Sequence, residues 1–425
     1  MYVIENKYDK FGPDVLCGWQ CVRTDTPDAK AIRKRSGGFA DYLLGARLTQ
    51  LVLPDTLAAH EEPMNIVKAT RKFEEWLNLR TQVINEDIKF KHKEMACAAF
   101  PFLRATFYRW VQIWPEICDE VAKAPRVIGV GDLHVENFGT WRDAEGRLIW
   151  GVNDFDEAAA MPYTNDLVRL ATSALLAIEE GKLALKGKAA CEAILEGYES
   201  ALEAQGEAFV LEEKHSWLRD LANGGLRDPT HFWKKMDDLK PVRGEISVSA
   251  RDALEHHLPS RDLAYRLVSR VSGLGSLGRV RLVALAEWKG GRLAREAKAL
   301  VASSVCWQEE NQHPAEILCQ VIASRAVRCV DPFFQVRYRW IVRRLSPHCG
   351  RISLSDLPRH HDELHLLQAM GWETANIHLG SRDGIKQVRK HLRSLKRDWL
   401  ASAAKKMANS VKDDWDIWRK EYKAS

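Results

Sequence analysis

The chain has 425 residues, of which 46% are hydrophobic and 28% are charged, with 26 glycines and 15 prolines. These proportions are those of a globular protein that buries its own core, so they exclude a disordered, collagen-like or low-complexity chain. At roughly 150 residues per domain, two or three compact units are expected. The 63 Lys and Arg against 58 Asp and Glu give a formal net charge of only +5, so no nucleic-acid partner is predicted.

The spacing of the cysteines and the lack of long apolar runs predict the cellular setting. The nine cysteines are scattered and never spaced C-x-x-C, which favours neither a disulfide framework nor a zinc ribbon. Residues 1–7 lack the pattern of a signal peptide, and no run of about 18 apolar residues is present. We therefore expect a cytoplasmic protein without a membrane partner, whose oligomeric state the sequence does not indicate.

The first third of the chain is expected to be mainly helical. Residues 1–60 are mixed and rich in turn-forming residues. From 64 to 123, apolar side chains such as Phe73, Trp76 and Leu77 recur at three-to-four spacing, which predicts amphipathic helices.

Short β-branched runs then interrupt the helical pattern. Residues 127–130 and 147–152 are two such runs, each followed by a dense polar cluster, and they predict two buried strands that deliver polar loops. A helix from 166 to 180 follows, with further helices up to about 225.

A second β-rich region is predicted from 265 to 300, with another strand at 338–345. The last 60 or so residues predict helices. The final one is amphipathic and, with Trp415 and Trp418 on one face, is expected to pack on the domain.

The two polar clusters contain the residues that phosphoryl transfer requires. They read Gly-Asp-Leu-His-Val-Glu-Asn-Phe-Gly over 131–139 and Asn-Asp-Phe-Asp-Glu over 153–157. Such a reaction needs an Asp that accepts a hydroxyl proton, and an Asn and a second Asp that hold a phosphate-bridging metal. Asp132 fits the base, Asn137 and Asp154 fit Mg²⁺ ligands, and Asp156 fits a second ion. The alternative is that these loops only cap helices or form tight turns.

These residues also carry a resemblance to known proteins. Gly131-Asp132-Leu133-His134 with Asn137, followed by 153–156, resembles the catalytic and metal loops of aminoglycoside phosphotransferases and choline kinases. The resemblance implies ATP and Mg²⁺ as cofactors, and implies that Asp166 braces the catalytic loop. The chain also resembles domain-of-unknown-function family 2252, in five blocks at 100–104, 131–139, 151–170, 273–278 and 342–345.

A glycine-rich segment lies inside the second β-rich region. Gly273, Gly275 and Gly278, with Ser276 between the last two, read G-x-G-x-x-G. A dinucleotide-binding loop requires a helix immediately afterwards, whereas here an alternating β run follows, which favours the hairpin form that covers ATP phosphates in kinases. The alternative is a glycine-rich hairpin with bulges.

A kinase-like site also needs a cation on the next strand. The candidates are Arg295 and Lys298, each of which could instead lie on a solvated face. The family resembled here has Lys where this chain has Arg295, and the two residues are not interchangeable. Reach slightly favours Lys298.

Arg104 and His378 have competing interpretations. Arg104 lies on a mostly apolar face, which favours a structural role in anchoring a carboxylate near the catalytic loop, with phosphate contact as the alternative. His378 is expected to pack beside Trp372, with a role in the site as the alternative. The adjacent pairs at 256–257 and 360–361 are poor chelators, because neighbouring residues of a helix point to different faces.

The order of the motifs is unusual, since in kinases the glycine loop and lysine precede the catalytic loop. We expect an α+β, two-lobed, protein-kinase-like (aminoglycoside phosphotransferase-like) fold that is circularly permuted, with extra helices at both ends. The hypothesis fails if 265–300 packs far from Asp132 and Asp154. The expected regions are an N-terminal helical region, a catalytic-loop and metal-loop lobe, a β-rich small lobe and C-terminal helices, at 1–120, 121–255, 256–350 and 351–425.

The sequence thus predicts Mg²⁺- and ATP-dependent phosphoryl transfer to a hydroxyl of a small molecule or protein. A pseudokinase-type nucleotide-binding scaffold is one alternative, kept open by Arg295, and nucleotidyl (AMP) transfer is another. A metallophosphoesterase also uses a G-D-x-H loop, but the later G-N-H-[DE] element that it needs is missing from the sequence.

Overall fold

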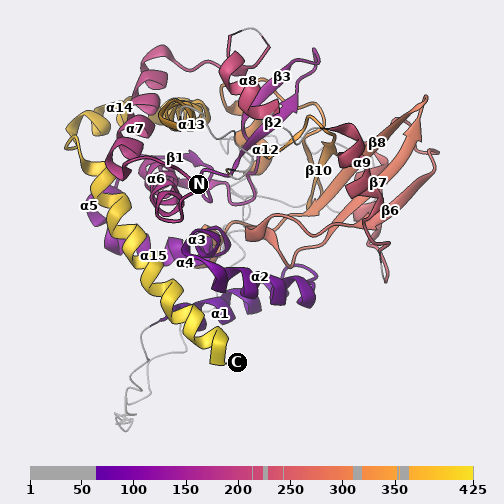
Figure 1. The fold of residues 1–425 in the computed structure, drawn as a ribbon, viewed down its shortest axis with the longest axis horizontal. Coiled ribbons are helices and arrows are strands. Elements are labelled where there is room, and N and C mark those ends of the chain that lie inside the picture. The colour runs from indigo at the N-terminus through magenta and orange to yellow at the C-terminus, as the bar shows by residue number, and fades with distance from the viewer. Residues whose placement is uncertain are drawn as a thin grey trace, which may run out of the picture. The chain divides into compact units, whose positions relative to one another are not determined.

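The structure, a computed structural model, describes residues 64–212, 214–223, 228–242, 244–309, 318–351, 354 and 363–424. The predicted turn-rich segment at 1–60 and the histidine pair at 360–361 lie outside these residues. Residues 63–425 form one compact unit. Its described part is mixed α+β, as predicted, with three antiparallel sheets and many helices (Figure 1).

The region from 64 to 123 is helical, as its periodicity predicts. The Asn65 side chain begins the first helix by accepting a hydrogen bond from the Lys68 N–H at 2.9 Å. The apolar face of this helix buries Phe73 and Leu77. The helices are α1 (Ile66–Asn78), α2 (Asn85–Cys97), α3 (Ala99–Ala105), α4 (Phe107–Ile117) and α5 (Asp119–Ala122).

Two small sheets follow the first helices. Strands β1 (Arg126–Gly129) and β4 (Ala159–Pro162) form one pair. The second sheet has the order β11-β2-β3-β5, and its members are β2 (Phe138–Arg142), β3 (Leu148–Val152), β5 (Phe209–Val210) and β11 (Gly350–Arg351). The two runs predicted as strands, 127–130 and 147–152, therefore belong to different sheets. Strand β2 was not predicted, because its residues follow directly on a polar cluster.

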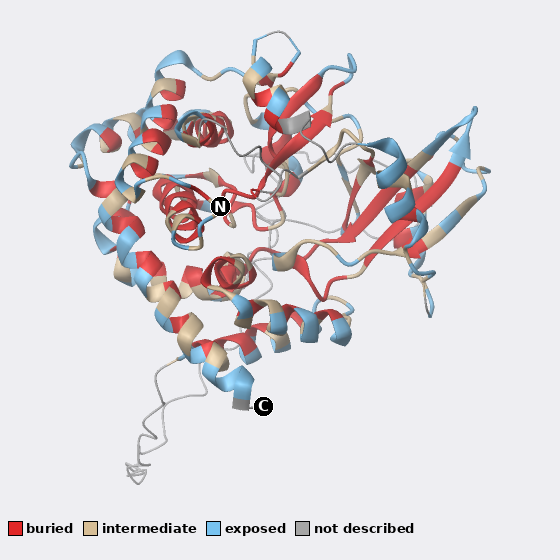
Figure 2. Ribbon diagram, viewed as in Figure 1, coloured by how far each residue is buried: buried red, intermediate tan, exposed pale blue. Residues whose placement is uncertain are grey.

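A group of long helices surrounds the first pair of strands. They are α6 (Tyr163–Glu179), α7 (Gly187–Ala204), α13 (Glu363–His378), α14 (Ile385–Ser394) and α15 (Trp399–Ala424). Figure 2 shows α6 buried along most of its length, so its polar side chains must find partners inside the protein. Helices α7 and α13 approach closely at Gly197 and Gly371, where an added Cβ would lie within about 2 Å of the facing backbone.

The C-terminal helix α15 packs on the domain, as expected from its tryptophans. Trp418 is buried and its indole N–H donates to the carbonyl oxygen of His92 in α2. Arg109 of α4 pairs with Asp414 of α15, with 2.8 Å between Nε and Oδ2. None of the described helices is both long and apolar enough to cross a membrane.

The largest sheet has the order β6-β7-β8-β10-β9 and is antiparallel throughout. Its strands are β6 (Tyr265–Ser269), β7 (Arg281–Trp288), β8 (Gly291–Ala299), β9 (Gln335–Arg337) and β10 (Trp340–Leu345). Strands β7 and β8 are joined by Lys289 and Gly290, both at positive φ, which is the geometry of a tight two-residue hairpin turn.

Helices cover both faces of this sheet in part. Helix α10 (Val248–Glu255) packs on one face against apolar residues of β7, β8 and β10. Helix α9 (Pro229–Asp237) packs through Met236 on the opposite face, near the β7–β8 hairpin. The remaining described elements are α8 (Ser216–Asn223), α11 (Ser304–Gln308), α12 (Cys319–Arg325) and the short 3-10 turns Leu274–Ser276 and Arg382–Gly384.

Candidate functional site

The polar loop after β1 places Asp132 beside a buried arginine. The Nε and Nη2 atoms of Arg169, on α6, donate to Asp132 Oδ1 at 2.9 and 2.5 Å. Burial raises the pKa of Asp132, and the Arg169 charge opposes this effect. The Asp132 side chain is 18% exposed, so it remains accessible. Sequence reasoning did not single out Arg169, whose contact with Asp132 arises only from tertiary packing.

Asp166 holds the backbone of this loop. Its carboxylate, fully buried in the first turn of α6, accepts hydrogen bonds from the N–H groups of Val130 and Gly131 at 2.6 and 2.9 Å. The bracing that the resemblance implied for Asp166 is thus visible as two charge-assisted hydrogen bonds.

His378 stands behind Asp166. It is fully buried at the end of α13, with Nε2 3.1 Å from Asp166 Oδ2 and Nδ1 2.9 Å from the hydroxyl of Tyr198. A C-terminal helix therefore supports the Asp132 loop through Asp166. The indole N–H of Trp372, the residue beside which His378 is expected to pack, donates to the carbonyl oxygen of Glu207.

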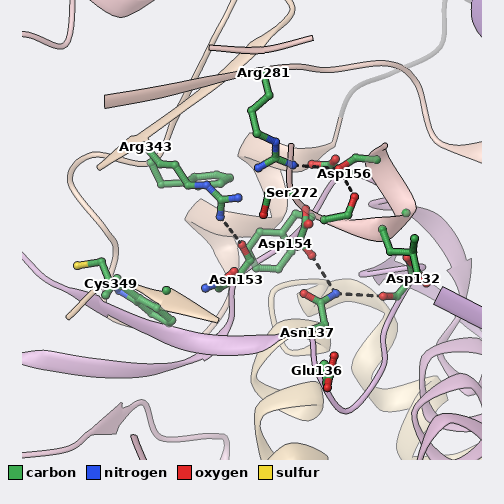
Figure 3. Close-up of a pocket in the computed structure, with 18 of the residues that line it drawn as sticks. Asp132, Glu136, Asn137, Asn153, Asp154, Asp156, Ser272, Arg281, Arg343 and Cys349 are labelled. Carbon is green, nitrogen blue, oxygen red and sulfur yellow. Dashed lines mark hydrogen bonds between the residues drawn. The ribbon is translucent and has the colours of Figure 1, made fainter. Parts of the chain in front are cut away.

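Asn137 joins the two polar loops. Its amide nitrogen donates to the carbonyl oxygens of Asp132 and Asp154, at 3.0 and 3.3 Å (Figure 3). The Asn153 N–H in turn donates to the Asn137 carbonyl oxygen. Because the amide nitrogen is committed to the backbone, the amide oxygen is the atom of this side chain that can ligate a cation.

Lys298 lies between the two carboxylates of the second loop. Its buried Nζ is 3.1 Å from Asp154 Oδ1 and 2.5 Å from Asp156 Oδ2. Burial and the neighbouring Asp154 raise the pKa of Asp156 to about 6. For Asp154 burial acts in the same direction, but the charges of Lys298 and Arg343 outweigh it and hold its pKa well below the ordinary range.

The donor set fits Mg²⁺ in the way that phosphate-bound Mg²⁺ is usually held. Asp156 Oδ1 is buried and has no hydrogen-bond partner among the described residues, and the Asp154 side chain remains 37% exposed. Carboxylate and amide oxygens are hard ligands, and Mg²⁺ commonly takes one or two carboxylates together with phosphate oxygens and water. In the described part of the chain no group of three or more His, Cys, Asp or Glu could hold a metal alone. Substrate phosphate or water would therefore complete the coordination.

The glycine loop joins β6 to β7 and lies against the Asp132 loop. A Cβ on Gly275 would be 3.0 Å from the Arg104 carbonyl oxygen and 3.1 Å from Asp132 Oδ2, so a larger residue would require these neighbours to shift by a few tenths of an ångström. Ser276 Oγ accepts a hydrogen bond from Arg281 at 3.0 Å. Gly278 faces away, toward Ile88 of α2.

The two candidate cations of β8 lie on opposite faces of the sheet. Lys298 reaches Asp154, whereas the Arg295 guanidinium stacks on Phe333, 4.2 Å from the ring centre, and donates to the His257 carbonyl oxygen. Side chains alternate along a strand, so residues three apart cannot share a face. The structure therefore does not bring Arg295 to the other candidate residues.

Arg104 contributes to the wall of the site through an ion pair. Its Nη1 lies 2.6 Å from Oε2 of Glu136, which belongs to the Asp132 loop. This contact agrees with the structural interpretation of Arg104, in which the guanidinium anchors a nearby carboxylate.

These side chains meet at one cavity of about 500 Å³. Loops from the small sheets, the glycine loop, the first residue of β7 and the last three residues of β10 contribute to it. Of the predicted site residues, those that line the cavity are Arg104, Asp132, Asn137, Asp154, Asp156, Gly273, Gly275 and Ser276. Lys298 contacts two of them, while Gly278 and Arg295 do not line the cavity.

Lys91 is a buried amine next to this cavity. It lies on α2, 3% exposed, with Nζ 5.5 Å from the centre of the cavity-lining Tyr108 ring. No hydrogen bond or ion pair to this Nζ occurs within the described ranges. Burial lowers the pKa of Lys91 from 10.5 to about 8, so stability should rise with pH across that interval, where the unfolded chain binds more protons.

We therefore expect Lys91→Met to raise the free energy of unfolding by about 2 kcal/mol at pH 7, with a smaller gain near pH 10. Urea unfolding of both proteins at the two pH values measures this. Lys188→Met removes an exposed lysine and should change the free energy by less than about 0.5 kcal/mol. A Lys91→Met variant that is less stable at pH 7 would contradict the interpretation.

Comparison with known protein families identifies a match to part of the chain. A family model described as "Uncharacterized protein conserved in bacteria (DUF2252)" matches residues 82–218. The matched segment contains both polar loops and helix α6, and it ends before the glycine loop and Lys298. Comparisons with curated proteins and with solved structures gave no match. The resemblance to family 2252 is thus supported over residues 82–218.

Proposed function

We propose that this chain is a Mg²⁺-dependent, ATP-using phosphotransferase that acts on a hydroxyl of a small molecule or protein. One observation carries the proposal. Asp132, Asn137 and Asp154, from two neighbouring loops, line one cavity with the glycine loop, and Lys298 from a separate sheet contacts Asp154. Phosphoryl transfer needs this combination of a proton acceptor, hard oxygen ligands and a phosphate-holding cation.

Each residue has a role that its contacts support. Asp132 accepts the proton of the acceptor hydroxyl, and Arg169 fixes the orientation of its carboxylate. Asn137, Asp154 and Asp156 hold Mg²⁺, which when bound neutralises charge on the phosphate oxygens. Lys298 then holds the phosphates under the glycine loop.

The large sheet supports a kinase-like arrangement. Its glycine loop joins the first and second strands in chain order, and Lys298 lies on the third. Protein kinases likewise cover the phosphates with a glycine-rich loop and place the lysine on the third strand. Segment 265–300 lies close to Asp132 and Asp154, as the permuted two-lobed arrangement that we propose requires.

One contact favours a second candidate, a nucleotide-binding scaffold. Asp132 Oδ1 is already bonded to two nitrogens of Arg169, and this pairing opposes the rise in pKa that burial gives the carboxylate. AMP transfer, the further variant, would use the same cavity and would release pyrophosphate in place of ADP.

Calorimetric titration of ATP, with and without Mg²⁺, tests the proposal. The wild type should bind ATP more tightly with Mg²⁺ than without it, and Asp154→Asn should weaken binding in Mg²⁺ about 100-fold, because a carboxylate ligand is lost. Asp237→Asn, which alters a half-exposed aspartate paired with Arg292, should stay within about twofold. Absence of binding to the wild type under both conditions would overturn the proposal. Binding without formation of ADP, AMP or pyrophosphate would favour the scaffold.

A further inference from the structure

Three arginines surround one buried carboxylate on strand β8 of the large sheet. Glu296 of β8 is fully buried, and its oxygens accept from Arg281 Nη1 at 2.9 Å, Arg343 Nε at 3.1 Å and Arg270 Nη1 at 2.5 Å. Sequence reasoning assigned no role to these arginines. They come from β7, from β10 and from the residue that follows β6.

The sheet register explains why these side chains converge. Arg343 lies directly opposite Glu296 across β8 and β10, and Arg281 lies opposite Lys298 across β7 and β8. Glu296 and Lys298 are two residues apart on one strand, so they share a face. One face of the sheet therefore presents the arginines and Lys298 together.

The cluster carries an excess of positive charge. Three guanidinium groups and Lys298 face three carboxylates, those of Glu296, Asp154 and Asp156, so one positive charge is left over. The side chains of Arg281 and Arg343 are only 4% and 19% exposed, and water screens buried charges poorly. The surplus charge is best satisfied by an anion.

Donors also remain for such an anion. A guanidinium has five N–H groups, and the described contacts use two nitrogens each of Arg281 and Arg343 and one of Arg270. All three arginines line the cavity that holds Asp154. In the view of Figure 3, Arg281 and Arg343 lie on the opposite side of Asp154 from Asn137.

We propose that Arg270, Arg281 and Arg343 form a polyphosphate-binding site that works without a metal ion. Its ligand is the polyphosphate of the nucleotide, an identification that rests on the proposed function, and inorganic tripolyphosphate carries the same chemistry. Planar guanidinium groups bind pairs of phosphate oxygens, whereas a lysine offers a point charge. The site adds a set of contacts beyond Lys298 and the glycine loop.

Titration of sodium tripolyphosphate in EDTA tests the site directly. The wild type should bind, and Arg270→Gln should bind at least about tenfold more weakly. Arg270 is chosen because its side chain, 26% exposed, is the most accessible of the three, and Glu296 keeps two partners in the variant. Arg292→Gln is the matched control, since Arg292 lies at the exposed end of the same strand β8 as Glu296, and it should remain within about twofold.

Asp154→Asn separates this site from the proposed metal site. In EDTA the variant removes a negative charge beside the arginines, so tripolyphosphate should bind more tightly, whereas Mg²⁺-dependent ATP binding should weaken. Failure of the wild type to bind tripolyphosphate in EDTA, or an unchanged affinity in Arg270→Gln, would overturn the arginine site even if MgATP binds. Tripolyphosphate binding that is lost in Arg270→Gln, in a protein that does not bind MgATP, would support the site and overturn the proposed function instead.

Discussion

Asp132→Asn is expected to lower the rate of phosphoryl transfer about 1,000-fold while changing MgATP affinity less than about threefold. A positioned general base contributes roughly 10²- to 10⁴-fold to such reactions. Asparagine keeps an oxygen for Arg169, whose Nε and Nη2 both reach Asp132 Oδ1, so the hydrogen-bond geometry is largely retained while the charge and the proton acceptor are lost. The substitution should therefore lower kcat and leave MgATP binding nearly unchanged.

Basal hydrolysis of MgATP, followed by release of ADP and phosphate, measures this effect without a known acceptor. Calorimetry on the same samples separates binding from turnover. Asp237→Asn again serves as the control, because this residue lies on α9 and pairs with Arg292 at the exposed end of the large sheet. If Asp132→Asn hydrolyses MgATP at the wild-type rate, Asp132 is not the general base.

Asp166→Ala is expected to lower the free energy of unfolding by about 4 kcal/mol. The substitution leaves the buried N–H groups of Val130 and Gly131 without an acceptor, and each such group costs about 1–3 kcal/mol. His378 also loses its carboxylate partner.

Denaturant unfolding monitored by tryptophan fluorescence measures the loss. Asp220→Ala removes an exposed aspartate of α8 and should shift the free energy by no more than about 0.5 kcal/mol. If Asp166→Ala stays within about 1 kcal/mol of the wild type, Asp166 does not brace the loop. The milder Asp166→Asn keeps one acceptor oxygen, so its free energy of unfolding should lie between those of the wild type and Asp166→Ala. It provides a measurable variant if the alanine protein fails to fold.

Local patterns were sufficient to predict the mixed α+β class and most elements near the site. The alternation of charged and apolar residues at 279–285 predicted β structure, and β7 covers most of that range. The helix predicted from 166 begins three residues earlier, at Tyr163, within the normal uncertainty of helix ends. Strand β2 escaped prediction because it begins inside the polar cluster at 131–139, and no local pattern encodes its pairing with β3 and β11.

The choice between Arg295 and Lys298 as the cation near the polar loops could not be made from local sequence patterns. Strand alternation requires that the two residues occupy opposite faces. Which face meets the polar loops depends on the packing of α10 over the Arg295 side, a long-range contact that the sequence does not reveal.

By itself, then, the sequence identified segments that line the cavity: the loops with Asp132, Asn137 and Asp154, and the glycine loop at 273–278. Turn residues and hydrophobic periodicity are local properties, so these segments could be recognised without a fold. The tertiary structure alone decided which side chains act together. Arg169 on Asp132, His378 behind Asp166, and the arginines around Glu296 join residues far apart in the chain, and only the packing of the helices and sheets brings such residues within bonding distance.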